Sequence, residues 1–253
     1  MHGCNGHMGQ VISGIVEKDP DAEIVAGIDI ADQGKNSYPV FTDIDTCQVE
    51  ADAIIDFSSA KATDKLLEYS AARQIPVVLC STGLSQEQLA KVEETSRKVA
   101  VLKSANMSLG INTLLKLVQD AAKVLATAGF DMEIVEKHHR LKLDAPSGTA
   151  ITLAEGILEN IDRKDKWVKG TLVAPDGSVS GNTVYAPDEL PVSSVREGEV
   201  PGIHTIRYDS EADSISITHD AKNRKGFALG AVLAAEYTAQ HEGFLGMNDL
   251  FQF

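Results

Sequence analysis

The chain has 253 residues, 43% of them hydrophobic, and a formal net charge of −14 at pH 7, which argues against nucleic acid as a partner because a polyanion would be repelled. It contains no apolar run of about 18 residues and no basic-then-apolar leader, so we expect neither membrane insertion nor export. Cys4, Cys47 and Cys80 follow no C-x-x-C spacing, which favours a reducing cytoplasm over a disulfide framework or a zinc site.

The first predicted helix begins near Met8 and follows a glycine-rich run, Gly3-Cys4-Asn5-Gly6-His7-Met8-Gly9. Glycines let a backbone approach a pyrophosphate, and a helix N-terminus offers free N–H groups with a partial positive charge. The spacing is a variant of the dinucleotide fingerprint, and a glycine-rich turn that caps a helix explains the run equally well. Asp29 ends the next predicted strand and favours the dinucleotide, because a carboxylate there accepts hydrogen bonds from the adenosine ribose.

Asp29 also predicts that NADH is preferred over NADPH. A 2′-phosphate would meet its carboxylate, and the following Ile30 and Ala31 supply no arginine to bind that phosphate. Lys35 in the next loop is close enough in sequence to reach a 2′-phosphate, so use of both cofactors stays open.

Short apolar runs alternate with amphipathic stretches over the first half of the chain, a rhythm typical of a parallel sheet covered by helices on both faces. The predicted strands are 23–29, 53–57, 76–80 and 100–102, and the predicted helices between them are 61–73 and 85–98. Three of these strands run into small polar loops at 56–59, 81–83 and 104–108. Ligands bind outside the carboxyl ends of such strands, so we expect the three loops to line one crevice.

In a dinucleotide-binding fold, a β-strand leads into the glycine-rich loop. Only Met1 and His2 precede Gly3 in this sequence, which is too short for such a strand. Such a strand lies centrally in the sheet, and its loss would remove several apolar side chains from the core. We therefore expect the natural protein to carry about six or seven further residues before Met1, mostly Val, Ile or Leu. The alternative is a true truncation, with a weakened cofactor site and a stability that depends on oligomerisation.

The second half of the chain has a different pattern of predicted helices and strands. A long helical pattern covers 108–128, and then come a predicted strand at 131–136, a helix at 147–160 and β-rich runs at 167–174, 183–185, 202–208 and 214–218. These elements do not alternate regularly, which indicates a separate α+β domain with a mixed or antiparallel sheet. A last, alanine-rich helix is predicted over 226–240.

One basic cluster, His138, His139, Arg140 and Lys142, lies in a chain that otherwise prefers acidic residues. Adjacent histidines beside a lysine are more often a solvated loop than a catalytic site in an arbitrary protein. A metal site is disfavoured, because the two histidines are neighbours and no third ligand has a fitting spacing.

The segment after the cluster predicts an anion site. Pro146 suits the first turn of the next helix, and Ser147, Gly148 and Thr149 would present donors at the N-terminus of that helix. Asp144 is interpreted as a helix cap. With the basic cluster upstream, the pattern predicts a small electropositive pocket for a small polyanion.

The run from Glu136 to Ala150, E-K-H-H-R-L-K-L-D-A-P-S-G-T-A, resembles the E-x-H-H-x-x-K-x-D-A-P-S-G-T-A signature of dihydrodipicolinate reductases. Further matches follow in the family's order: G-C-N-G-H-M-G, I-D-F-S-S, C-S-T-G, S-A-N-M-S-L-G-I-N, S-V-R-E-G-E-V-P-G-I-H-T-I and G-F-A-L-G-A-V. The resemblance implies an α/β Rossmann-like parallel-sheet domain, residues 1–107 plus 219–253, and an α+β substrate-binding and tetramer-forming domain, residues 108–218. It also implies a cytoplasmic homotetramer that uses NADH or NADPH to reduce 4-hydroxy-tetrahydrodipicolinate, a small dicarboxylate, to tetrahydrodipicolinate in lysine (diaminopimelate) biosynthesis.

The same resemblance assigns roles to residues. His138 matches the proton donor or acceptor and Lys142 the second proton donor. His139, Gly148 and Thr149 match the contacts to the substrate carboxylates. The pyrophosphate loop comprises Gly3, Cys4, Asn5, Gly6, His7 and Met8, and the loops around the nicotinamide comprise Cys80, Ser81, Thr82, Ser104, Ala105, Asn106 and Met107. Cys80 stands where many family members have glycine, which weakens the assignment of that residue alone.

Two other functions stay open at this point. A related Rossmann reductase acting on another small acid would keep the cofactor loop and change the pocket, and the H-H-x-x-K and P-S-G-T combination speaks against it. A dinucleotide sensor or inactive homologue would fit a shortened N-terminus. Turnover of NADH in the presence of the cyclic imine separates an enzyme from a sensor.

Overall fold

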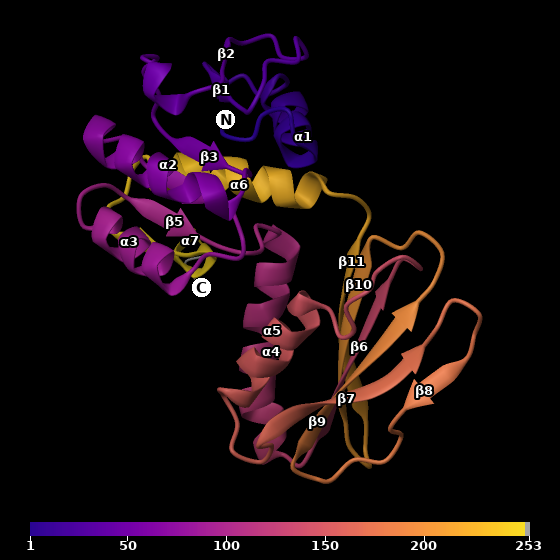
Figure 1. Ribbon diagram of the computed structural model, residues 1–253. Helices are drawn as coiled ribbons and strands as arrows, with labels where there is room; N and C mark the ends of the chain where they lie inside the picture. Colours follow the sequence, from indigo (N-terminus) through magenta and orange to yellow (C-terminus); the bar gives the residue numbers. More distant parts are fainter. Residues whose placement is uncertain (251–253) are drawn as a thin grey trace. The chain divides into compact units, whose positions relative to one another are not determined.

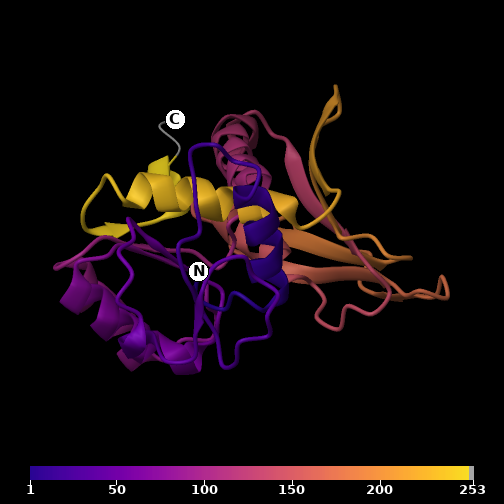
Figure 2. The same cartoon turned by 90° about the horizontal axis from the view of Figure 1, so that it is seen from above.

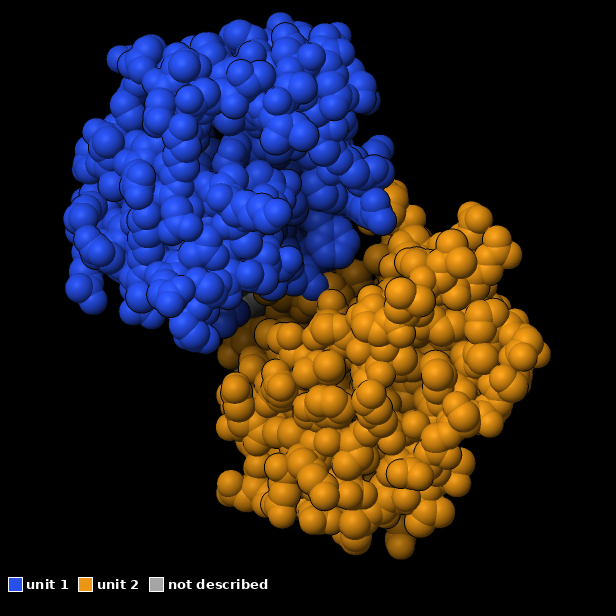
Figure 3. Space-filling view, viewed as in Figure 1, with its two compact units in different colours: residues 1–109, 224–253 blue, residues 110–223 orange. Residues whose placement is uncertain are grey.

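A computed structural model describes residues 1–250. The chain forms two compact units: unit 1 comprises Met1–Leu109 and the chain from Arg224 onward, and unit 2 comprises Gly110–Asn223 (Figure 3).

Unit 1 is built on a parallel sheet with the strand order β12-β5-β4-β3. Its strands are β3 (Ile54–Asp56), β4 (Val77–Leu79), β5 (Val101–Lys103) and β12 (Phe244–Leu245). The first three confirm the strands predicted in this part of the chain. A second parallel pair, β1 (Gly27–Ile28) and β2 (Val40–Phe41), is connected to the sheet through His2, which bridges both Ile28 and Asp56.

Helices cover both faces of this sheet, as Figures 1 and 2 show. The helical elements of unit 1 are α1 (His7–Val16), η1 (Ile44–Thr46), α2 (Ala60–Arg73), α3 (Gln86–Ser96), α6 (Lys225–Thr238) and α7 (Met247–Leu250). Neighbouring strand residues point to opposite faces, so Val78 packs in the cluster with α1 and α6 whereas Val77 packs in the cluster with α2 and α3.

The predicted strand at 23–29 is largely wrong, because only Gly27–Ile28 is paired as a strand. The stretch from Ala22 to Ala26 belongs to no strand.

Unit 2 contains a mixed sheet with the order β11-β10-β6-β9-β7-β8. Its strands are β6 (Asp131–His138), β7 (Lys166–Val173), β8 (Val179–Gly181), β9 (Glu189–Arg196), β10 (Gly202–Asp209) and β11 (Ser214–Ala221). β9 pairs in parallel with β6 and β7, and the other pairs are antiparallel. The helices α4 (Leu109–Thr127) and α5 (Gly148–Leu158) lie against one face (Figure 1).

Two predictions in unit 2 need correction. The strand predicted at 183–185 is absent, because the chain leaves the sheet at Gly181, whose φ is +94°. The strand β9 was not predicted from the sequence. Pro191 and a pair of serines interrupt its apolar pattern, although the strand lies between β6 and β7 in the sheet.

Candidate active site

The strand β6 carries the centre of the site on the same face that enters the core. Met132 and Ile134 join the hydrophobic core, and Glu136 and His138 follow on that face toward the end of the strand. Strand register places Glu136 between Ser194 of β9 and His204 of β10. The site therefore begins where the core of unit 2 ends.

Glu136 is a fully buried carboxylate held by several donors. Arg196 donates from Nη2 to Oε1 at 2.7 Å and from Nη1 to Oε2 at 3.1 Å, and Ser194 also donates to the carboxylate. His138 meets the same carboxylate through Nδ1. Burial opposes ionisation of Glu136, but the hydrogen bonds from His138 and Arg196 outweigh it and lower the pKa of the carboxyl to about 2. Glu136 is thus an anion at any pH above that value.

The contact to Glu136 fixes the orientation of the His138 ring. With Nδ1 engaged, Nε2 is the nitrogen left to face a ligand. Nε2 lies toward Gly202, where an added Cβ would sit 3.0 Å from it. Glycine at this position therefore keeps the space beside His138 Nε2 open.

His204 packs edge to face on His138, with their ring centroids 5.2 Å apart. Its Nε2 lies 3.2 Å from Ser147 Oγ, and Ser147 caps α5 by accepting a hydrogen bond from the Ala150 N–H. Burial, followed by the charge of His138, lowers the pKa of His204 to about 3. His204 is therefore neutral near pH 7 and ties the strand face to the first turn of the helix.

Lys142 lies in the loop between β6 and α5, half-buried, and its Nζ binds both oxygens of Asp144 at 2.7 and 2.8 Å. Arg196 holds this loop on the sheet, because it donates to the Lys142 carbonyl at 3.3 Å and the Asp144 carbonyl at 2.7 Å. The interpretation of Asp144 as the helix cap is wrong, since Ser147 has that position.

Two of the three residues predicted to bind carboxylates lie at the start of α5. Gly148 and Thr149 are its first two residues, and His139 follows directly after β6. Gly148 is exposed, and an added Cβ there would meet nothing within 4 Å. The space before the helix N-terminus is open to a ligand, and the backbone can approach that ligand closely. Pro146 precedes the cap and so lies outside the first turn where it was expected.

In unit 1 the glycine-rich run forms a tight loop that leads into α1, whose N-cap is Gly6. Gly9 is required by close packing, because an added Cβ would lie 2.3 Å from the Gly3 carbonyl oxygen. Asp29 accepts a hydrogen bond from the Asn5 N–H at 2.8 Å, so the structure brings the loop and the predicted ribose-binding acid together. His7 is exposed and Met8 half-buried in the first turn of the helix.

The carboxyl ends of β3 and β4 are joined by the buried Asp56. Its carboxylate accepts hydrogen bonds from Ser58 Oγ and Ser81 Oγ, each at 2.6 Å, and lies 2.8 Å from His2 Nδ1. The pKa of Asp56 is lowered because these hydrogen bonds outweigh the effect of burial. Sequence reasoning assigned no role to this aspartate, although an acid directly after a buried strand was a usable signal.

The predicted nicotinamide residues follow β4 and β5. Cys80 is buried, and burial raises the pKa of its thiol, whereas Thr82 is exposed. The segment 104–108 is braced internally, with Ser104 Oγ donating to the Asn106 carbonyl at 2.9 Å. Ala105 is exposed at the turn, and Met107 is buried with its carbonyl against Gly230 of α6.

Two family models together match nearly the whole chain: "Dihydrodipicolinate reductase, N-terminus" over residues 1–107 and "Dihydrodipicolinate reductase, C-terminus" over residues 110–251. The chain belongs to the dihydrodipicolinate reductase family. A relative from Caldanaerobacter subterraneus subsp. tengcongensis, named 4-hydroxy-tetrahydrodipicolinate reductase, is 42% identical, with 99% of this chain and 96% of the relative covered. A relative of the same name from Clostridium perfringens strain SM101 is 39% identical, with 100% of this chain and 97% of the relative covered.

A solved structure supports the fold of this family member. The dipicolinate-bound dihydrodipicolinate reductase from Paenisporosarcina sp. TG-14 matches with a TM-score of 0.81 at 24% identity, covering 98% of this chain and 97% of that one. Within residues 1–250 of this reductase-family chain, no helix is long and apolar enough to cross a membrane, and no group of three or more His, Cys, Asp or Glu side chains is placed to hold a metal ion.

Proposed function

We propose that this chain is an NAD(P)H-dependent 4-hydroxy-tetrahydrodipicolinate reductase, which reduces a small cyclic dicarboxylate to tetrahydrodipicolinate in lysine and diaminopimelate biosynthesis. The observation that carries the proposal is the site of unit 2, in a chain 42% identical to a relative of that name. There His138, oriented by Glu136, lies in the same segment as Lys142 and the open N-terminus of α5.

Unit 1 would bind the dinucleotide. Close packing at Gly9 keeps the loop tight. The N–H groups of Gly3 to Gly6 donate within the unit, so the pyrophosphate would face the N–H groups of the first turn of α1, at His7 and Met8. The contacts would come from Gly3 to Met8, with Cys80, Ser81, Thr82, Ser104, Ala105, Asn106 and Met107 around the nicotinamide. When bound, the nicotinamide supplies the hydride for the reduction.

NADH is the preferred cofactor in this proposal. Asp29 holds the Asn5 N–H and presents a carboxylate where a 2′-phosphate would lie, and the next residue, Ile30, is 94% exposed and uncharged. The charge repulsion would lower the affinity for NADPH, and Lys35 is the one residue in the next loop able to offset it.

Unit 2 would bind the substrate through its two carboxylates. The backbone of Gly148 and the hydroxyl of Thr149 lie at the positive end of α5, and His139 lies just after the strand that carries His138. The open space above Gly148 fits a carboxylate pressed against the backbone. Such groups fix the substrate ring relative to the proton donors.

His138 and Lys142 would supply protons to the ring. Glu136 is ionised and holds Nδ1 of His138, so Nε2 is the nitrogen that would pass a proton to the substrate. Lys142 must leave Asp144, or share its proton while paired, to act as the second donor. The carboxylate Asp144 keeps the Lys142 side chain in the loop until the anionic substrate competes for it.

We also propose that the enzyme is a cytoplasmic homotetramer assembled through unit 2. On the face of the sheet away from α4 and α5, Val135 is half-buried and Thr218 is exposed, so the face offers area for a subunit contact. Its three free cysteines suit a reducing compartment. Light scattering after gel filtration tests the subunit number.

The test of function is a coupled assay with pyruvate, aspartate semialdehyde and the preceding synthase, followed through the loss of NADH absorbance. The enzyme is expected to oxidise NADH only when the cyclic product of the synthase is present. Binding of NADH without turnover would instead identify a sensor or inactive homologue. Oxidation of NADH with another small keto or imino acid, but not with this product, would identify a different reductase.

A further inference from the structure

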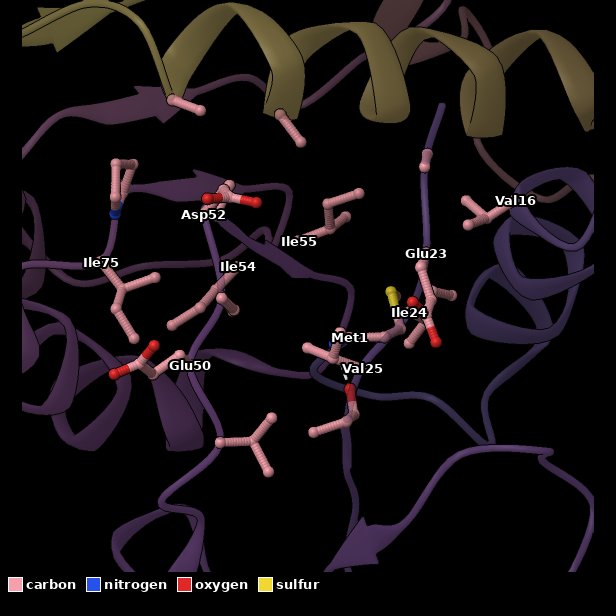
Figure 4. Close-up of a pocket in the computed structure, with 18 of the residues that line it drawn as sticks. Met1, Val16, Glu23, Ile24, Val25, Glu50, Asp52, Ile54, Ile55 and Ile75 are labelled. Carbon is pink, nitrogen blue, oxygen red and sulfur yellow. Dashed lines mark hydrogen bonds between the residues drawn. The ribbon is translucent and has the colours of Figure 1, made fainter. Parts of the chain in front are cut away.

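The two sides of α1 face different surroundings within unit 1. Its apolar residues Ile12 and Val16 line a cavity of about 810 Å³, and Figure 4 shows Val16 among the lining side chains. Gln10 lies on the opposite side of the helix and donates from Nε2 to Asn36 Oδ1 at 2.8 Å. Asn36 belongs to the segment that connects β1 to β2, so the polar side of α1 is joined to that segment.

Three side-chain amides form a directed chain of hydrogen bonds beside the glycine-rich loop. Gln10 donates to Asn36, and Asn36 Nδ2 in turn donates to Asn5 Oδ1 at 3.0 Å. Asn5 Nδ2 then donates to the Ala31 carbonyl at 2.6 Å. Each of the two asparagines accepts through its oxygen and donates through its nitrogen, so the amides orient one another.

Asn36 has the central position in this chain. Its oxygen accepts from Gln10, and its Nδ2 has two acceptors, Asn5 Oδ1 and, at 3.7 Å, Cys4 Sγ. A primary amide has two N–H hydrogens, so both are used. Gln10 also donates to the Cys4 carbonyl at 2.9 Å, which joins α1 to the same loop directly. The half-buried Asn36 side chain therefore connects the segment, the loop and the helix.

The chain of amides ends beside the proposed ribose-binding acid, Asp29. The Asn5 backbone N–H donates to Asp29 Oδ2 at 2.8 Å, and the Ile30 N–H donates to Asp29 Oδ1 at 2.8 Å. The side chain of Asn5 holds Ala31, two residues after Asp29. The carboxylate is thus fixed relative to the glycine-rich loop through both of its oxygens and through the backbone that follows it.

Close packing at β1 adds to these hydrogen bonds. An added Cβ at Gly27 would lie 2.7 Å from both Cys4 Sγ and Tyr38 Cε2, so glycine lets both side chains approach the strand. Tyr38 Oη lies 2.7 Å from Ser13 Oγ of α1. The segment between β1 and β2 is therefore held against the loop and the helix by packing as well as by the amides.

We propose that Asn36 is a positioning residue of the dinucleotide site: its amide holds Asp29 and the glycine-rich loop in the arrangement that favours NADH over NADPH. The inference rests on the proposed binding of a dinucleotide to unit 1. With Asp29 held in place, its carboxylate accepts from the ribose hydroxyls of NADH and repels the 2′-phosphate of NADPH. Without the Asn36 amide, Asp29 and the segment 30–35 are free to shift, which weakens the ribose contacts and relieves the repulsion.

The test measures the dissociation constants of NADH and NADPH by fluorescence titration for the wild type, Asn36→Ala and Asn160→Ala. Asn160 is the matched control, because it is also half-buried and donates a side-chain hydrogen bond, to the Gly156 carbonyl at 2.8 Å in unit 2. Asn36→Ala should weaken NADH binding by about tenfold, which corresponds to about 1.4 kcal/mol, and NADPH binding by no more than about threefold. Asn160→Ala should leave both constants within about twofold of the wild type.

Two further measurements distinguish positioning from a general loss of stability. Amide hydrogen exchange at Asn5, measured without cofactor, should be about tenfold faster in Asn36→Ala and unchanged in Asn160→Ala. Gln10→Ala breaks the same chain at its other end and should also weaken NADH binding. The double variant Gln10→Ala/Asn36→Ala should bind NADH within about twofold of the weaker-binding single variant, because both residues act through one network.

The outcomes separate this inference from the proposed function. Equal NADH binding by the wild type and Asn36→Ala, or an equal loss for both cofactors, would show that Asn36 does not position the site. Additive effects of Gln10→Ala and Asn36→Ala would overturn the shared chain. A wild type that binds neither cofactor refutes the dinucleotide site and this inference together, whereas a wild type that binds NADH without turnover refutes the proposed reaction alone.

Discussion

Replacing Glu136 by Gln tests how the buried carboxylate serves the proton donor. The substitution keeps the size of the side chain but removes the charge that Arg196 and His138 share. Arg196, with its side chain 4% exposed, would keep a buried charge without its partner. Breaking such a pair costs about 3–5 kcal/mol, a large part of a total stability of about 5–15 kcal/mol.

The catalytic effect of the same change comes from His138. An ionised Glu136 accepts from Nδ1 and so orients the ring, whereas a Gln amide can donate an N–H to Nδ1 and reverse the tautomer of the ring. We expect kcat to fall by about 10²-fold, which corresponds to about 2.7 kcal/mol of transition-state stabilisation. The KM for NADH should stay within about twofold, because the residues proposed to bind the dinucleotide lie in unit 1.

A double variant separates the two effects. Glu136→Leu with Arg196→Met removes both charges, so it should recover much of the stability lost in Glu136→Gln while turnover stays low. Steady-state kinetics and thermal unfolding of the wild type and both variants supply the measurements. If Glu136→Gln loses stability but keeps kcat within about threefold, the carboxylate is structural and the proposed role in proton transfer is wrong.

Four further outcomes are expected. His138→Gln and Lys142→Ala should each lower kcat by about 10²-fold and leave the dissociation constant for NADH, measured by fluorescence titration, nearly unchanged. Thr149→Val should raise the substrate KM by about 10-fold to 100-fold, since a lost hydrogen bond to a carboxylate is worth about 1.5–3 kcal/mol, and an unchanged KM would remove Thr149 from the carboxylate site. The ratio kcat/KM should favour NADH, and Asp29→Ala should reduce that preference; a clear NADPH preference of the wild type contradicts this reading. His204, with its pKa lowered to about 3, resists protonation when folded, so its contribution to stability is complete above about pH 6.5 and is lost as the pH falls toward 3, by up to about 1.4 kcal/mol per pH unit. Denaturant titrations of the wild type and His204→Asn at several pH values should show that the difference in unfolding free energy changes over that window.

Local sequence patterns correctly predicted the strands that pair with strands close to them in the sequence. The apolar runs at β3, β4 and β5 are largely buried strands of a parallel sheet, and their Val, Ile and Leu content identifies them. β9 escaped prediction because its burial comes from flanking strands that the chain forms elsewhere, so its own Pro191 and serines obscure the pattern.

The candidate site was predictable only in part for the same reason. The segment from Glu136 to Thr149 contains most of the proposed contacts, and its residue types alone indicate an anion pocket. Arg196 lies 60 residues after Glu136, and only the pairing of β9 with β6 brings the two side chains together. Strand register of this kind depends on tertiary structure, so no spacing in the sequence reveals it.

The position of His138 on β6 explains why its ring is ordered. Side chains on one face of a strand repeat every second residue, so Met132, Ile134, Glu136 and His138 form a single row. The first two are locked in the core, which fixes the backbone beneath Glu136. Glu136 in turn fixes the ring of His138, at the last position of the strand, where the side chain is 11% exposed. The packing of Met132 and Ile134 in the core therefore holds Glu136, and through Glu136 the His138 ring, in a fixed position. A substitution at Ile134, such as Ile134→Ala, should therefore lower kcat as well as stability, although this residue is not one of the proposed substrate contacts.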